Sequence, residues 1–147
     1  MTSKQHKNIA TLIHLSTFSR FILPLGNFLG PLLLWATNKE KSNFVDNHGK
    51  QALNFQLSIL FYTLVIGILS IPFFIFKLFK GFHLDFFHSH NWHFSFHEAS
   101  PLLVFGGLLG FFAIIAFILE LVFIIKASIK AKDGEPYNYP LTINFIK

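Results

Sequence analysis

The stretch Asn43 to Tyr62, NFVDNHGKQALNFQLSILFY, runs from a charged surface segment into an apolar helix without a break. Within it, polar residues recur at spacings of four, three, four and four, which places them on one face of a helix. These residues are Asn47, Gln51, Asn54, Ser58 and Tyr62. Because the neighbours of Ser58 are apolar, the polar face is expected to turn toward protein rather than lipid.

The beginning of this stretch carries the signals of a helix start. Asn43 is a candidate N-cap, and Asp46 falls in the first turn, where the helix dipole favours negative charge. Lys50 follows Asp46 by four residues, so the two side chains can pair. The helix is therefore expected to begin in water and to continue into the membrane.

The composition excludes several classes of protein. Apolar residues make up 52% of the chain and charged residues only 13%, which is far from the soluble average. The net charge of +5 comes from lysines at the ends of apolar segments, where anionic headgroups lie, so no nucleic-acid partner is predicted. The chain has no cysteine, which excludes disulfides, thiolate metal sites and cysteine nucleophiles.

Three apolar segments, at about residues 9–36, 53–79 and 101–126, define the expected fold. Residues 53–76 and 101–125 each exceed the ~20 residues that cross a hydrocarbon core. We therefore predict an all-α integral membrane protein, a single domain over residues 1–147. It would be a compact helical bundle with two full spans and a broken or hairpin-like N-terminal apolar segment.

The N-terminal segment contains several residues that interrupt a helix. Pro24 with its neighbours predicts a break near residues 23–27, which leaves two half-helices with Arg20 near the tip of a hairpin. In that arrangement one side of the membrane holds nine lysines, against Arg20, Lys77 and Lys80 on the other. The crowded side should be cytoplasmic, which places both termini there, in an inner membrane. A single span through this segment is the alternative, and it would put Arg20 within the bilayer.

The linker at residues 80–100 is rich in histidine and aromatic residues. Its histidines are His83, His88, His90, His93 and His97. On a helix the last three would share one face, as in a zinc or copper site. The aromatic neighbours fit an interfacial loop equally well, and we favour that interpretation. No metal and no cofactor are predicted, and His14 and His48, outside the linker, are expected to be hydrogen-bonded interior or surface histidines.

Glu120 is the one charged residue inside the third apolar segment. An ionisable group at this depth usually faces the bundle and marks a pathway or a packing contact. Gln51, Asn54 and Ser58 enter the second span to a similar depth, so the four residues are expected to form a polar interaction cluster. Gly106 and Gly110 have the spacing that permits close helix approach.

Four blocks of sequence carry a family resemblance. They are HLS at His14–Ser16, GPLLLW at Gly30–Trp35, VDNHGKQALNFQ at Val45–Gln56 and KAKDGEPYNYP at Lys130–Pro140. With these blocks the chain resembles a bacterial membrane-protein family of unknown function, named for its similarity to the twenty-kilodalton Tic component of chloroplast protein import. Lys132 departs from the family, which has asparagine there.

The resemblance implies a compact helical membrane fold with cytoplasmic ends and no catalytic residues. It also marks a surface turn as the family motif, with Asp46, His48, Gly49 and Lys50.

The residues assemble no catalytic constellation, because the only acid at membrane depth is Glu120 and no nucleophile has a base nearby in the pattern. We therefore predict no enzyme, but an accessory or scaffold protein of the membrane, with a role near protein translocation implied by the resemblance. The alternative is a small transporter or metal-handling protein that uses Glu120 and the histidine-rich linker. The expected partners are the lipid bilayer and either another membrane protein or a second copy of the chain.

Overall fold

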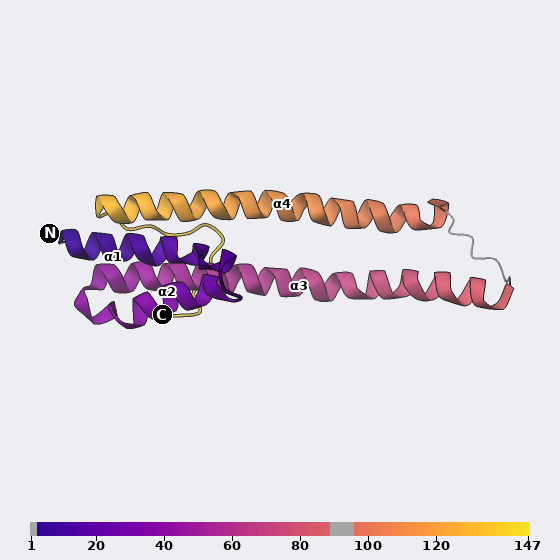
Figure 1. Ribbon diagram of the computed structural model, residues 1–147, viewed down its shortest axis with the longest axis horizontal. Coiled ribbons are helices and arrows are strands. Elements are labelled where there is room, and N and C mark those ends of the chain that lie inside the picture. Colours follow the sequence, from indigo (N-terminus) through magenta and orange to yellow (C-terminus); the bar gives the residue numbers. More distant parts are fainter. Residues whose placement is uncertain (1–2, 89–95) are drawn as a thin grey trace. The chain divides into compact units, whose positions relative to one another are not determined.

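The computed structural model describes residues 3–88 and 96–147, with side chains placed in 3–76 and 103–147. All regular structure in these ranges is helical, as Figure 1 shows. The elements are α1 (Lys4–Leu15), η1 (Ser16–Phe21), α2 (Gly26–Ala36), η2 (Lys39–Lys41), α3 (Asn43–His88) and α4 (Phe96–Asp133). The all-helical part of the predicted fold is confirmed.

Two helices are long and apolar enough to cross a membrane. The candidate spans are Asn43–Phe76 in α3, with 34 residues, and Leu103–Asp133 in α4, with 31 residues. At about 1.5 Å per residue each is longer than the ~30 Å hydrocarbon core. They overlap the second and third apolar segments of the sequence.

The chain divides into two compact units. Unit 1 comprises Met1–Phe61 and Leu119–Lys147, and unit 2 comprises Tyr62–Ile118. Helices α3 and α4 each contribute residues to both units. The single domain over residues 1–147 stays a prediction.

The N-terminal apolar segment is broken where the prolines and glycines predict it. After α1 the chain tightens into η1, and Leu25 adopts a left-handed conformation with φ 60° just before α2. Ser19 Oγ closes this reversal by donating to the backbone oxygen of Gly26 at 2.6 Å. Helices α1 and α2 would reach only about 18 and 17 Å, less than the hydrocarbon core. The predicted break is confirmed, while the entry of this segment into the bilayer stays a prediction.

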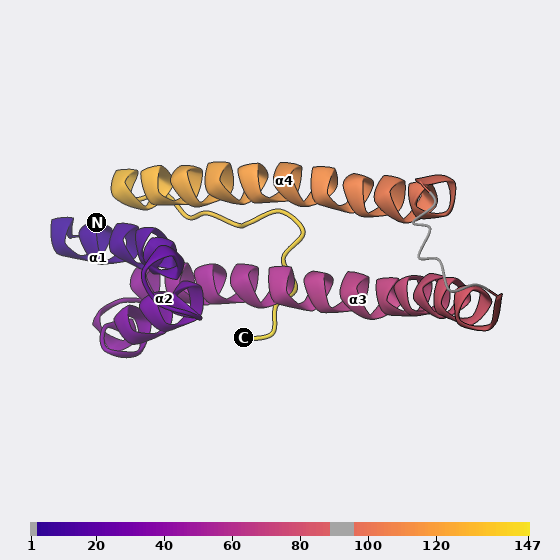
Figure 2. The same ribbon diagram turned by 45° about the vertical axis from the view of Figure 1, so that its right-hand side comes forward.

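The core of unit 1 consists of small clusters where α1, α2 and the tail meet α3 and α4. One cluster contains Phe55, Ile124, Ala127 and Tyr139, and the other contains Ile13, Val45 and Ala52. Figures 1 and 2 show α1 and α2 beside the first part of α3. Gly49 permits this approach, because a Cβ there would lie 2.1 Å from Cδ1 of Trp35.

Helix α4 ends at a glycine, as the sequence predicts. Gly134 has a φ of 85°, and the backbone N–H of Glu135 donates to the oxygen of Lys130 at 2.9 Å. This pattern satisfies a carbonyl of the last turn in the manner of a Schellman motif. Residues 135–147 then follow without a further helix and form a C-terminal tail.

In unit 2 the described side chains of α3 and α4 are largely exposed and apolar. Phe105 contacts Phe73 and Phe74, with ring centroids 4.3 and 5.9 Å apart. Cβ atoms placed on Gly106 and Gly110 would meet nothing within 4 Å. Among the described side chains no helix therefore approaches closely at these two glycines, and large aromatic side chains make the contacts nearby.

Candidate functional site

Glu120 lies in the interior of unit 1 and is 6% exposed. Its carboxylate accepts two hydrogen bonds from the guanidinium of Arg20, of which the bond from Nη1 measures 3.0 Å. Gln56 Nε2 donates a third, at 3.2 Å to Oε1. Glu120 is thus shielded from water while the Arg20 side chain is 23% exposed, and the two charges meet in the bidentate geometry that suits arginine and carboxylate.

Gln56 connects this ion pair to a fourth side chain. Its Oε1 accepts from Arg20 Nη2 and from Asn27 Nδ2, each at 2.9 Å. The polar interior, which we define as Arg20, Asn27, Gln56 and Glu120, therefore joins η1, α2, α3 and α4. In each of these contacts an N–H donor meets an oxygen acceptor, as buried polar networks require.

The sequence singles out Glu120, which the structure buries, but its observed partners differ from those expected. Gln51, Asn54 and Ser58, the partners expected for it, bind the C-terminal tail instead. The reason is rotational: Gln56 follows Asn54 by two residues, about 200° around the helix, so α3 presents one polar face to the tail and another to Glu120. A usable signal did exist, because Arg20 and Glu120 are isolated opposite charges in apolar segments, and such groups pair.

The face of α3 with Gln51, Asn54 and Ser58 holds the tail through its backbone. Asn54 Oδ1 accepts from the N–H of Ile146 at 2.8 Å, and Asn54 Nδ2 donates to the oxygen of the same residue at 3.0 Å. Ser58 Oγ accepts from Ile143 at 2.8 Å, while Gln51 Oε1 accepts from Tyr139 at 3.4 Å. These side chains thus bond to the backbone groups of the tail, as a neighbouring strand would in a sheet.

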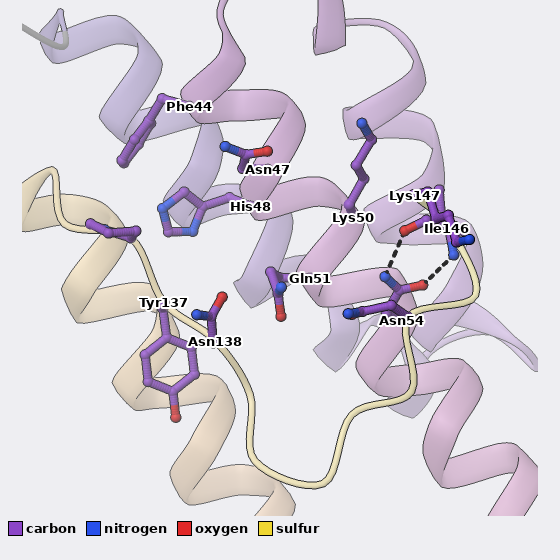
Figure 3. Close-up of a pocket in the computed structure, with 12 residues that line it drawn as sticks. Phe44, Asn47, His48, Lys50, Gln51, Asn54, Tyr137, Asn138, Ile146 and Lys147 are labelled. Carbon is purple, nitrogen blue, oxygen red and sulfur yellow. Dashed lines mark hydrogen bonds between the residues drawn. The ribbon is translucent and has the colours of Figure 1, made fainter.

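A cavity of about 390 Å³ lies between this part of α3 and the tail. Figure 3 shows its lining, with the paired bonds from Asn54 to Ile146 at one side. The lining combines amides, two lysines and rings: Phe44, Asn47, His48, Lys50, Gln51, Asn54, Pro136, Tyr137, Asn138, Asn144, Ile146 and Lys147. Glu120 does not border it.

Two histidines and a tyrosine form a buried chain of hydrogen bonds in the same unit. His14 Nε2 lies 2.8 Å from His48 Nδ1, and His14 Nδ1 lies 2.9 Å from the hydroxyl of Tyr139. Burial, with a smaller contribution from His48, lowers the pKa of His14 to about 3. Burial also raises the pKa of Tyr139 well above its ordinary value. His14 is thus a neutral hydrogen-bonding residue, as expected for an interior histidine.

The residues of the family motif lie in a helix rather than in a surface turn. Asp46 and Lys50 pair at 2.5 Å, as their spacing predicts, and Asp46 also accepts from Trp35 Nε1 at 2.9 Å. His48 is 2% exposed, and Gly49 faces Trp35. Asp46 and Gly49 therefore hold α2 against the first turns of α3 through Trp35, while His48 points into unit 1.

The histidine-rich linker carries two alternative predictions, and neither is tested. His90 and His93 lie outside the described residues, and the side chains of His83, His88 and His97 do too, so the interfacial loop and its metal-binding alternative stay predictions. In the described part of the chain no three histidine, aspartate or glutamate side chains gather as metal ligands would.

Comparison with protein families gives a match that covers nearly the whole chain. No curated protein and no solved structure matches the chain. Residues 5–146 match MamF/MmsF, described as the magnetosome magnetite crystal formation protein family. This is a membrane-associated bacterial family, as the sequence predicts, but nothing supports the resemblance to the Tic component or a role in translocation. Because the match covers nearly the whole chain, the protein belongs to the magnetosome magnetite crystal formation protein family.

Proposed function

We propose that this protein is a non-enzymatic accessory protein of the membrane in which magnetite crystals form, and that it acts as a scaffold for other membrane components. The family match supports a role in the formation of magnetite crystals. The observation that carries the scaffold role is the closed polar interior, where Glu120 is neutralised by Arg20 and bonded by Gln56. A carboxylate held in this way contributes to packing between helices.

The polar interior distinguishes this role from transport. A proton or ion carrier needs a carboxylate that exchanges its ligand with water, usually at a cavity. Glu120 instead has a permanent cationic partner and lies outside the 390 Å³ cavity. The transporter or metal-handling alternative now depends mainly on the histidine-rich linker and stays a prediction, as does a role in translocation.

Replacing both residues of the ion pair with uncharged amides distinguishes a scaffold from a transporter. Arg20→Gln/Glu120→Gln keeps hydrogen-bonding amides at both positions but removes the ionisable group. Deletion of the gene in a magnetite-forming host should alter crystal size or number in electron micrographs, and the double variant should restore both. If the folded double variant does not restore the crystals while the original chain does, the carboxylate of Glu120 is itself required, as transport would demand.

The scaffold role also requires a membrane partner. Affinity capture from native membranes after crosslinking should recover one stable membrane protein or a second copy of the chain. Normal crystals after deletion, together with no captured partner, would contradict the proposal.

The proposed topology places both termini and the loop before α3 on the cytoplasmic side. The lysine excess on that side supports it. Since the chain has no cysteine, Ser42→Cys and Ser89→Cys can each be labelled alone with an impermeant thiol reagent in intact cells. Protection of Ser42→Cys and labelling of Ser89→Cys are expected, and the opposite pattern would reverse the topology.

A further inference from the structure

Three lysines line a second cavity of unit 1, where α1 begins and α4 ends. The cavity measures about 320 Å³ and is lined by Lys4, Lys7, Asn8 and Lys132. Its lining therefore offers three ammonium groups and one amide, and it contains no carboxylate. This cavity is separate from the polar interior and from the cavity under the tail.

The fold brings these lysines together through bonds between α1 and α4. Lys7 Nζ donates to the backbone oxygen of Asp133 at 3.0 Å, and Thr11 Oγ1 donates to that of Ser128 at 3.4 Å. Gly134 lies beside this contact: its φ of 85° favours glycine, and the end of the Lys7 side chain packs over it. The side chain of Lys7 is thus held against the end of α4.

The charges of this cluster are not balanced by ion pairs. Lys4 and Lys7 lie one turn apart on α1, where like charges repel. No acidic residue occupies the first turn of α1, whose N-terminal end carries the positive end of the helix dipole. Within the described side chains no ion pair includes the three lysines, and Glu135 pairs with Lys130 instead. The cavity is consequently suited to an anion.

The position of the cavity indicates the class of anion. The apolar segment of α4 ends at about residue 126, and Lys132 follows it by six residues, about 9 Å along the helix, so the cavity lies near the expected level of the head groups. Basic pockets at such places bind the head groups of anionic lipids, and lysine binds phosphate as a compact point charge. We propose that Lys4, Lys7 and Lys132, with Asn8, bind a phosphate group, supplied by an anionic phospholipid or by free phosphate.

The test uses the full-length protein in nanodiscs of neutral phosphatidylcholine. Phosphatidylglycerol is titrated in one arm and inorganic phosphate at constant ionic strength in the other, with bound lipid counted by native mass spectrometry and phosphate by ³¹P NMR. A lysine near an anionic surface contributes about fivefold to affinity, so Lys4→Gln/Lys132→Gln should weaken binding about 30-fold. Loss in the lipid arm alone identifies the head group, and loss in both arms identifies phosphate from either source.

The matched control removes two lysines elsewhere. Lys39 stacks on Trp35 and Lys41 donates to Asn38, so Lys39→Gln/Lys41→Gln carries the same charge change away from the cavity. It should weaken binding much less than Lys4→Gln/Lys132→Gln does, because Lys39 and Lys41 do not line the cavity, while Lys4→Arg/Lys132→Arg should retain binding. Equal weakening by the control, or unchanged binding in the folded Gln variant, would overturn the proposal. If the double Gln variant does not fold, Lys4→Gln alone should still weaken binding about fivefold, and no weakening would overturn it equally.

Discussion

The two units of this protein distribute polarity in opposite ways. Unit 1 buries polar side chains: His14 and His48 are at most 2% exposed and Glu120 only 6%. In unit 2 the apolar side chains are outside, with Ile68 and Leu69 64% and 73% exposed. A soluble protein rarely exposes such a continuous apolar surface, whereas lipid tolerates it. The difference indicates that specific polar bonds hold unit 1, while unit 2 presents an apolar surface that lipid would cover.

Helix α3 changes along its length from buried polar side chains to exposed apolar ones. Up to Phe61 its faces bind Glu120, the tail and Trp35, and beyond Tyr62 its described side chains are mainly apolar and exposed. Substitutions in unit 1 should therefore affect stability far more than equivalent ones in unit 2. Four experiments test this contrast, all by unfolding of the purified protein in detergent unless stated.

Arg20→Leu should have the largest effect. It leaves the carboxylate of Glu120 buried without its cation, and removal of one partner from a buried pair costs about 3–5 kcal/mol of the free energy of unfolding. Arg20→Leu/Glu120→Leu should recover most of that loss, because no unpaired charge remains. A single variant as stable as the original chain would show that the ion pair does not hold unit 1 together.

A glycine pair compares the units directly. Gly49→Ala places a Cβ against the ring of Trp35 and should cost about 3 kcal/mol, at the upper end for overpacking. Gly67→Ala in unit 2 meets nothing within 4 Å and should be neutral or stabilise the helix by up to about 1 kcal/mol. Equal effects at both positions would contradict the contrast between the units.

Acid should weaken unit 1 through His14. Its folded pKa of about 3 lies below the ordinary histidine value of 6.5, so between these values the unfolded chain binds more protons. Stability is therefore unaffected above pH 6.5 and falls as the pH drops below it, by about 2 kcal/mol at pH 5. In His14→Gln the stability should change less between pH 7 and pH 5, and an identical pH dependence would assign the effect to other groups.

Asn54→Leu should have the smallest effect, of about 1 kcal/mol, because it removes two bonds to the backbone of Ile146 at the edge of unit 1. The better measurement is hydrogen exchange of the Ile146 amide, which should become faster. Asn47→Leu is the matched control, since Asn47 is exposed on the same helix. Unchanged exchange in Asn54→Leu would show that other contacts hold the tail.

Much of the candidate site could not be predicted because its partners are backbone groups. The tail has no periodic pattern, and Asn54 or Ser58 can bond to the main chain of any residue, so no residue type identifies the partner. The chain of His14, His48 and Tyr139 joins residues far apart in the sequence. No local spacing could have brought these three together.

The sequence by itself determined the presence of the helices, the break in the N-terminal segment and the end of α4. It did not determine every limit, because α3 runs to His88 and α4 begins at Phe96, both inside the linker expected at residues 80–100. Apolar length defines the candidate spans, Pro24 and its neighbours break the N-terminal segment, and Gly134 ends α4, since each is a property of the local chain. Only the tertiary structure decided which polar groups meet: Glu120 pairs with Arg20 and Gln56, and the face with Asn54 binds the tail. The physical reason is that a buried polar group requires a partner but does not specify which, and the rotation of packed helices makes that choice.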